Sequence, residues 1–156
     1  MTTKDHFTPG DWERLLTAPW VAGILVVFAD THITGMAKEF QALWQSLTVE
    51  APSGSAAGLV AELVQDMQGR EADEDTPAGD EDLDKEELLD LITAAAKLVD
   101  VKCAPDEAAG YRQWIMAAAR ATAEASKESW FFGIGGERVS DKEEAAMAEI
   151  EQALDR

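Results

Sequence analysis

VVFADTHIT, residues 26–34, is the stretch from which the fold of this 156-residue chain can be read. It begins with the end of an apolar helical pattern and continues through a polar turn at residues 30–32. The β-branched residue Ile33 and the hydroxyl cap Thr34 then precede a second helical pattern, which has an acid, Glu39, near its start. The stretch ATAEAS at residues 121–126 opens a second passage of the same order, in which Val139 and Ser140 supply the β-branched residue and the cap. The repetition indicates a weak internal pseudo-repeat of helix, turn and helix.

Helix signals run through the rest of the chain, and strand patterning is almost absent. Pro9 and Pro105 stand where helices begin, and Ser140 starts a capping box with Glu143. We take Pro19 as a further helix start, because proline disrupts a helix interior. The apolar spacing then predicts helices at about residues 9–16, 19–28, 34–47, 59–69, 88–99, 105–125 and 140–154. The predicted fold class is all-α, a compact bundle of about seven helices in a single domain over residues 1–156.

The chain is strongly acidic. It has 31 Asp and Glu residues against 13 Lys and Arg residues, and its formal net charge is −18 at pH 7. This charge repels nucleic acid and anionic lipid at long range, so we expect neither as a partner. Cations and basic protein surfaces are the natural counterparts. The 46% share of hydrophobic residues is typical of a globular protein with a substantial core.

Several features indicate a soluble, cytoplasmic protein. Cys103 is the only cysteine, so no intramolecular disulfide can form, which favours a reducing compartment. Lys102 and a following helix start could lower the pKa of that thiol, but we favour a small, half-buried apolar role for Cys103. Residues 1–10 carry no signal-peptide pattern, and the apolar run over residues 20–29 is too short for a membrane span. We therefore expect a buried core helix there and no membrane insertion.

Much of the negative charge is concentrated between residues 71 and 90, where eleven acids stand against the single base Lys85. A calcium loop is the specific interpretation, since Asp80, Asp82 and Asp84 have the spacing of EF-hand ligands. Lys85 and Leu91, however, stand where that loop needs glycine and glutamate. We therefore predict a flexible acidic linker at about residues 69–82 that runs into a helix with an acid-rich N-terminus.

The turns of the pseudo-repeat offer a candidate metal site. Asp30 and His32 lie in the first turn and Glu39 is early in the helix after it, so the three could surround a divalent cation if that helix folds back. Glu143 or Glu144 of the second passage would complete the set. The competing interpretation of His32 is a turn histidine that makes a local hydrogen bond. No other cofactor is expected.

Three adjacent aromatic residues, Trp130, Phe131 and Phe132, offer a candidate partner-binding site. They cannot all face one helix core, so the loop either tucks across the bundle or presents an apolar patch to a protein partner or to a second copy of the chain. No glycine-flanked serine, two-histidine metal motif or phosphate loop with a lysine is present in the sequence. We therefore expect a protein that is not an enzyme.

The order of alanine and acid at a turn, an aliphatic β-branched residue, a hydroxyl cap and an acid in the next helix resembles the tellurite-resistance TerB-like family. The resemblance is carried in the first passage by Ala29, Asp30, Ile33, Thr34 and Glu39, and in the second by Ala125, Ser126, Val139, Ser140, Glu143 and Glu144. It implies a compact bundle of about seven helices with a pseudo-repeat, divalent metal at the turn acids, and a role in stress-response or chaperone-associated complexes. The alternative is a separate family of small acidic helical proteins.

The sequence therefore predicts a non-enzymatic, acidic helical interaction module, stress-related if the resemblance holds. A divalent-metal-binding protein that uses turn carboxylates is the alternative.

Overall fold

The fold is all-α, as predicted. The computed structural model describes residues 2–29, 36–48, 57–70, 84–128 and 140–156. Within these residues a short 3-10 turn, Lys4–His6, precedes six α-helices. The helices are α1 (Pro9–Ala29), α2 (Met36–Thr48), α3 (Ala57–Arg70), α4 (Lys85–Lys102), α5 (Pro105–Glu128) and α6 (Asp141–Asp155).

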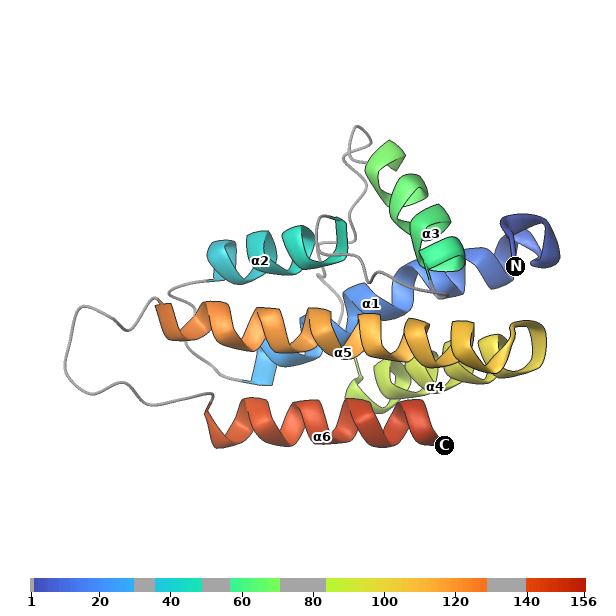
Figure 1. Ribbon diagram of the computed structural model, residues 1–156. Helices are drawn as coiled ribbons and strands as arrows, with labels where there is room; N and C mark the ends of the chain where they lie inside the picture. The colour runs from blue at the N-terminus through green and yellow to red at the C-terminus, as the bar shows by residue number, and fades with distance from the viewer. Residues whose placement is uncertain (1, 30–35, 49–56, 71–83, 129–139) are drawn as a thin grey trace.

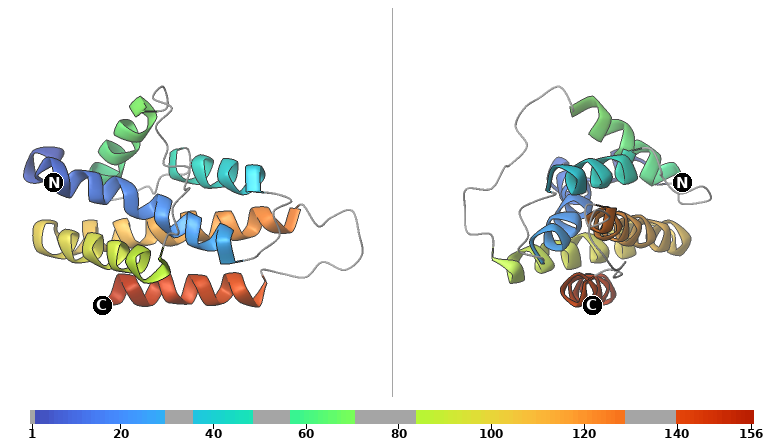
Figure 2. Two further views of the ribbon diagram at one scale, coloured as in Figure 1. Left: turned by 180° about the vertical axis from the view of Figure 1, so that it is seen from behind. Right: turned by 90° about the vertical axis from the view of Figure 1, so that its left-hand side faces the viewer.

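The helices form a compact bundle around α1 and α5 (Figure 1). Helices α2 and α3 lie on one side of this central pair and α6 lies on the other, beside α4 (Figure 2). Helix α1 contacts each of the other five described helices. The core is formed by buried aliphatic, alanine and aromatic side chains, of which the largest are Trp12, Trp114, Tyr111, Leu15, Leu43, Leu47, Leu59, Leu63, Ile92, Ile115, Ile150 and Val26.

The described residues form six α-helices where about seven were predicted, because Pro19 does not start a new helix. Helix α1 runs through it without a break, and Pro19 is buried. A proline nitrogen carries no hydrogen, so it cannot donate to the carbonyl four residues earlier, that of Leu15. The hydroxyl of Tyr111 on α5 donates to this carbonyl instead, at 2.8 Å. A side chain 96 residues further along the chain thus satisfies the acceptor that Pro19 leaves open.

The predicted helix starts at Pro9, Pro105 and Ser140 are confirmed. The backbone N–H of Asp11 donates to the Thr8 hydroxyl at 3.1 Å ahead of α1. The Ser140–Glu143 capping box is formed, with the Ser140 N–H on the Glu143 carboxylate at 2.9 Å and the Glu143 N–H on the Ser140 hydroxyl at 3.3 Å. Asp84 caps α4 by accepting the Glu86 N–H at 3.0 Å. The described end of the acidic stretch is therefore an acid-rich helix start, as predicted.

Helix α3 extends to Arg70, so Gly69, which was predicted to end this helix, lies inside it. Residues 71–83, which hold most of the predicted linker at about residues 69–82, lie outside the described residues.

Helix α1 is long and apolar enough to cross a membrane, and it is the one such helix among the described residues. In the bundle, 61% of its most apolar window is buried. Its backbone also comes very close to α2. A Cβ atom added at Gly23 would clash with the side chain of Leu43, which would have to shift to admit any larger residue.

Candidate functional site

Of the predicted metal ligands, the structure describes Glu39, Glu143 and Glu144, and it places Glu39 apart from the other two. Glu39 is buried in the first turn of α2. Glu143 is buried at the start of α6, where its carboxylate closes the capping box, and Glu144 beside it is exposed. Helices α2 and α6 lie on opposite sides of α1 and α5 (Figure 2), so the structure does not bring Glu39 to the α6 acids. Asp30 and His32 lie outside the described residues.

Among the described residues, no group of three or more His, Cys, Asp and Glu side chains could hold a metal ion. Metal binding at Asp30 and His32 stays a prediction. Calorimetric titration with calcium, magnesium, manganese and zinc is its test, and absence of both heat and thermal stabilisation would contradict it. Trp130, Phe131 and Phe132, the predicted partner-binding residues, also lie outside the part of the chain that the structure describes.

A different apolar surface lies within the described residues. The solvent-facing line of α1 begins with polar side chains, Glu13 and Thr17, and continues with apolar ones, Trp20, Ile24 and Phe28. These last three recur at every fourth residue and therefore share one side of the helix. Trp20 and Ile24 are partly buried, whereas 61% of the Phe28 surface is exposed.

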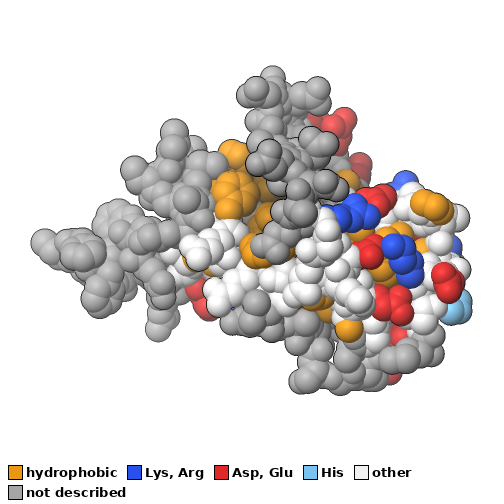
Figure 3. Space-filling model, turned by 90° about the horizontal axis from the view of Figure 1, so that it is seen from above, with side chains coloured by type: hydrophobic (Ala, Val, Ile, Leu, Met, Phe, Trp, Pro, Cys, Tyr) orange, Lys and Arg blue, Asp and Glu red, His pale blue; other side chains and the backbone are white. Residues whose placement is uncertain are grey.

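The apolar line of α1 continues onto α2. Phe40 and Trp44, one turn apart on α2, are partly buried. The rings of Trp20 and Trp44 lie 5.7 Å apart, centroid to centroid, and so join the two helices. We call the five side chains Trp20, Ile24, Phe28, Phe40 and Trp44 the aromatic face. In the view from above, hydrophobic side chains reach the surface near the middle of the molecule, whereas charged side chains gather at the N-terminal end (Figure 3).

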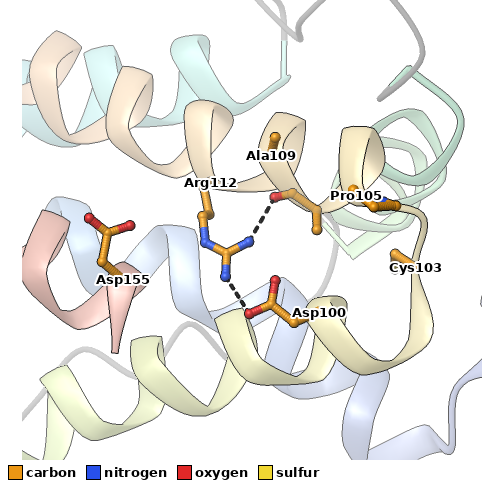
Figure 4. Close-up of a pocket in the computed structure, with 7 residues that line it drawn as sticks. Asp100, Cys103, Pro105, Ala109, Arg112 and Asp155 are labelled. Atoms are coloured by element: carbon orange, nitrogen blue, oxygen red, sulfur yellow. Dashed lines mark hydrogen bonds and ion pairs between the residues drawn. The ribbon is translucent and has the colours of Figure 1, made fainter.

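A small cleft of about 330 Å³ lies where α4, α5 and α6 meet. Arg112 lies between Asp100 and Asp155 in it (Figure 4). Its guanidinium donates to the Asp100 carboxylate at 2.6 Å, to the Leu154 carbonyl at 3.0 Å and to the Ala108 carbonyl at 3.4 Å. The Leu154 carbonyl is in the last turn of α6, where no helical donor follows. Arg112 therefore ties three helix ends together.

The charged side chains at the N-terminal end of α1 also make structural contacts. Asp66 of α3 accepts a hydrogen bond from the Trp12 indole at 2.7 Å and one from the Lys4 ammonium at 2.7 Å. The Lys4 ammonium is the main cause of a lowered Asp66 pKa. Arg70 binds Glu13 through both ends of its guanidinium and lowers the pKa of that carboxyl. These pairs hold α3 on α1.

The Cys103 thiol is half-buried, and desolvation raises its pKa. This direction is opposite to the activation that Lys102 could have caused. It supports the expectation that Cys103 fills space and is not a reactive nucleophile.

Sequence reasoning missed two parts of this arrangement. Helix α1 is apolar on nearly all sides after residue 17, so its periodicity does not tell which side is left exposed, and Phe28 was expected in a buried core helix. The bridging role of Arg112 could not be predicted from the sequence, because its three acceptors lie on three different helices.

Comparison with known proteins finds no match to a family model, to a curated protein or to a solved structure. The resemblance to the TerB-like family therefore stays a prediction.

Proposed function

We propose that this chain is a non-enzymatic interaction module whose aromatic face binds the apolar side of a basic partner protein. The observation that carries the proposal is Phe28, a large aromatic side chain that is 61% exposed at the end of a continuous apolar line. Aromatic side chains at the centre of an interface commonly supply most of its binding free energy. Trp20, two turns before Phe28 on α1, and Trp44 of α2, which contacts Trp20, offer further apolar area that a partner would cover.

The partner's charge follows from the charge of the chain. A protein with a formal net charge of −18 attracts basic surfaces and repels acidic ones at long range. A partner that presents an apolar strip flanked by lysine or arginine therefore matches both the aromatic face and the surrounding field. An amphipathic basic helix has this chemistry.

The hydrogen bonds of several partly buried polar side chains support a binding role over a catalytic one. Arg112 is held by acceptors on α4, α5 and α6, and Lys102 donates to Asp11 at 3.0 Å and to the His6 carbonyl at 3.2 Å. Asp66 accepts from Trp12 and Lys4. These groups serve the packing of the helices.

The test uses a synthetic helical peptide of leucine and lysine whose leucines share one side. Binding is followed by tryptophan fluorescence, since Trp20 and Trp44 lie in the proposed site. Phe28→Ser should weaken binding about tenfold or more. Val101→Ser is the matched control, because Val101 is 83% exposed on α4, outside the aromatic face. Both substitutions should change the unfolding free energy by less than about 0.5 kcal/mol.

A peptide of the same composition with its leucines scattered round the helix separates apolar docking from simple charge attraction. It should bind more weakly than the amphipathic peptide. Equal binding of the two peptides, or equal effects of the two substitutions, would contradict the proposal. Analytical ultracentrifugation of the chain alone tests whether the aromatic face binds a second copy of the chain instead. A dimer that Phe28→Ser dissociates would assign the face to self-association.

A further inference from the structure

Helix α1 has the length of a membrane-spanning helix, although the bundle buries 61% of its most apolar window. The apolar run over residues 20–29 alone is too short for a span, but the structure joins it to residues 9–19 in one helix of 21 residues. At about 1.5 Å per residue this helix is about 31 Å long, close to the roughly 30 Å hydrocarbon core of a bilayer. A proline inside the helix, as at Pro19, is tolerated in membranes.

The charged side chains of α1 are confined to its N-terminal end. They are Asp11, Glu13 and Arg14, and none follows from Leu15 to Ala29. With α1 across a bilayer, these three would lie level with the lipid headgroups, where charge is tolerated. The solvent-facing line of the helix is also apolar from Trp20 on. A helix that is apolar on nearly all sides suits lipid as well as it suits a protein core.

Two carboxylates of α1 hold this end in the bundle. The Lys102 ammonium of α4 donates to Asp11 at 3.0 Å, and Arg14 lies 3.5 Å from the same carboxylate. Arg70 of α3 binds Glu13 through both ends of its guanidinium, at 2.8 Å for one of them. These ion pairs are lost when the carboxylates are protonated, so acid weakens the attachment of α1 to α3 and α4.

Asp66 of α3 is a third carboxylate at this end. It accepts hydrogen bonds from the Trp12 indole and from the Lys4 ammonium, both at 2.7 Å. The Lys4 ammonium is the main cause of its lowered pKa, and Arg70 lowers the pKa further, whereas burial raises it. The Asp66 and Glu13 carboxylates also repel each other. The contribution of Asp66 to stability is therefore present at neutral pH and is lost in acid, as the folded carboxyl is protonated.

Acid also removes the repulsion between the chain and a membrane. The formal net charge is −18 at pH 7, but the sequence pI is about 4.2. Near that pH the long-range repulsion from anionic lipid disappears, and below it the chain is attracted. Proteins in acid commonly keep their helices while the side-chain packing loosens and apolar surface becomes exposed. Acid therefore brings the chain to a bilayer and loosens the bundle over the same pH range.

We propose that near pH 4 helix α1 leaves the bundle and inserts across a lipid bilayer, whereas at neutral pH it stays in the bundle core. The inserted helix exchanges its contacts with the other helices for contacts with lipid chains, so its apolar surface stays out of water. This state is distinct from partner binding by the aromatic face at neutral pH, and neither depends on the other.

Vesicles of phosphatidylcholine, with phosphatidylglycerol as the minor lipid, test the insertion at pH 7 and near pH 4. Trp20 lies close to the middle of α1, so its fluorescence should be quenched by lipids that are brominated in the middle of their acyl chains. We expect strong quenching near pH 4 and little at pH 7. Absence of quenching near pH 4, or equal quenching at the two pH values, would overturn the proposal.

Thr17→Arg separates insertion of α1 from binding of the chain to the vesicle surface. Thr17 is exposed in the bundle and lies near the middle of α1, where an arginine is strongly unfavourable in a bilayer. Near pH 4 this substitution should weaken the partition into vesicles about a hundredfold.

Gln113→Arg is the matched control, because it adds the same charge at an exposed position of α5. Circular dichroism at pH 7 checks that both variants keep the fold, as expected for exposed positions. The control should partition into vesicles as the unmodified sequence does. Equal partition of the two variants near pH 4 would mean that the chain binds without inserting α1, and the proposal would then be wrong.

Discussion

The hydrogen bond from Tyr111 to the Leu15 carbonyl should contribute more to the free energy of unfolding in a chain with Pro19 than in one without it. Tyr111→Phe removes the hydroxyl that donates to the Leu15 carbonyl at 2.8 Å. Tyr111 and Leu15 are both fully buried, and Pro19 supplies no hydrogen, so the carbonyl is left without a donor. A buried polar group that loses its partner costs about 1–3 kcal/mol.

A second substitution tests the role of Pro19 in that cost. Pro19→Ala restores an N–H that can donate to the Leu15 carbonyl in the ordinary helical way. In this background the Tyr111 hydroxyl is a second donor to an acceptor that is already satisfied, so its loss should cost no more than about 0.5–1.5 kcal/mol. The two substitutions should therefore be coupled by about 1 kcal/mol, which a double-mutant cycle can resolve.

Urea unfolding followed by circular dichroism measures the four unfolding free energies. A loss of about 2 kcal/mol for Tyr111→Phe in the parent chain corresponds to a fall in melting temperature of roughly 4–8 °C at this chain length. Thr122→Val is the control: its buried hydroxyl donates to the Ala118 carbonyl at 2.8 Å, an acceptor that keeps its helical N–H partner. It should show no coupling to Pro19→Ala. Equal costs of Tyr111→Phe in the two backgrounds would refute the reasoning.

Three other perturbations have defined outcomes. Gly23→Ala should lower stability by about 1–3 kcal/mol in thermal unfolding because its Cβ meets Leu43, and Leu43→Ala in the same chain should relieve part of that loss; a stabilising Gly23→Ala would contradict the close approach. Ser140→Ala should cost about 1 kcal/mol by urea unfolding through loss of the α6 cap, and no change would mean that the cap is redundant. Asp66→Asn should destabilise the chain near pH 7, and the difference should shrink as pH falls below about 4. The sign follows from the lowered pKa of Asp66, whose contribution is present above the unfolded-state pKa and lost as the folded carboxyl is protonated; a difference that grows in acid would contradict it.

Local chemistry made most of the helices predictable. Caps such as Ser140 and Asp84 act within a few residues, so their geometry can be read from adjacent positions in the sequence. Pro19 could not be read in this way, because the group that makes it tolerable is Tyr111, on another helix. Tertiary contacts decided the helix count there, against local propensity.

The candidate site was less predictable than the fold. The aromatic face depends on which side of α1 the other helices cover. The sequence of α1 does not indicate that side, because the helix is apolar nearly all round. Glu39 and Glu143 share a position in the pseudo-repeat, yet α2 and α6 lie on opposite sides of the bundle. Similar local sequence therefore did not imply proximity.

The dependence of α1 on Tyr111 also bears on how the chain is made. During synthesis α1 leaves the ribosome before α5, and Tyr111 follows 96 residues after Leu15. At about 5–20 residues per second, the Leu15 carbonyl waits roughly 5–20 s for its donor. Over that interval we expect a nascent chain with two short helical segments that meet at Pro19. We expect the continuous α1 to form only after α5 has been made, so the break that the sequence predicts at Pro19 should be present in the unfinished chain.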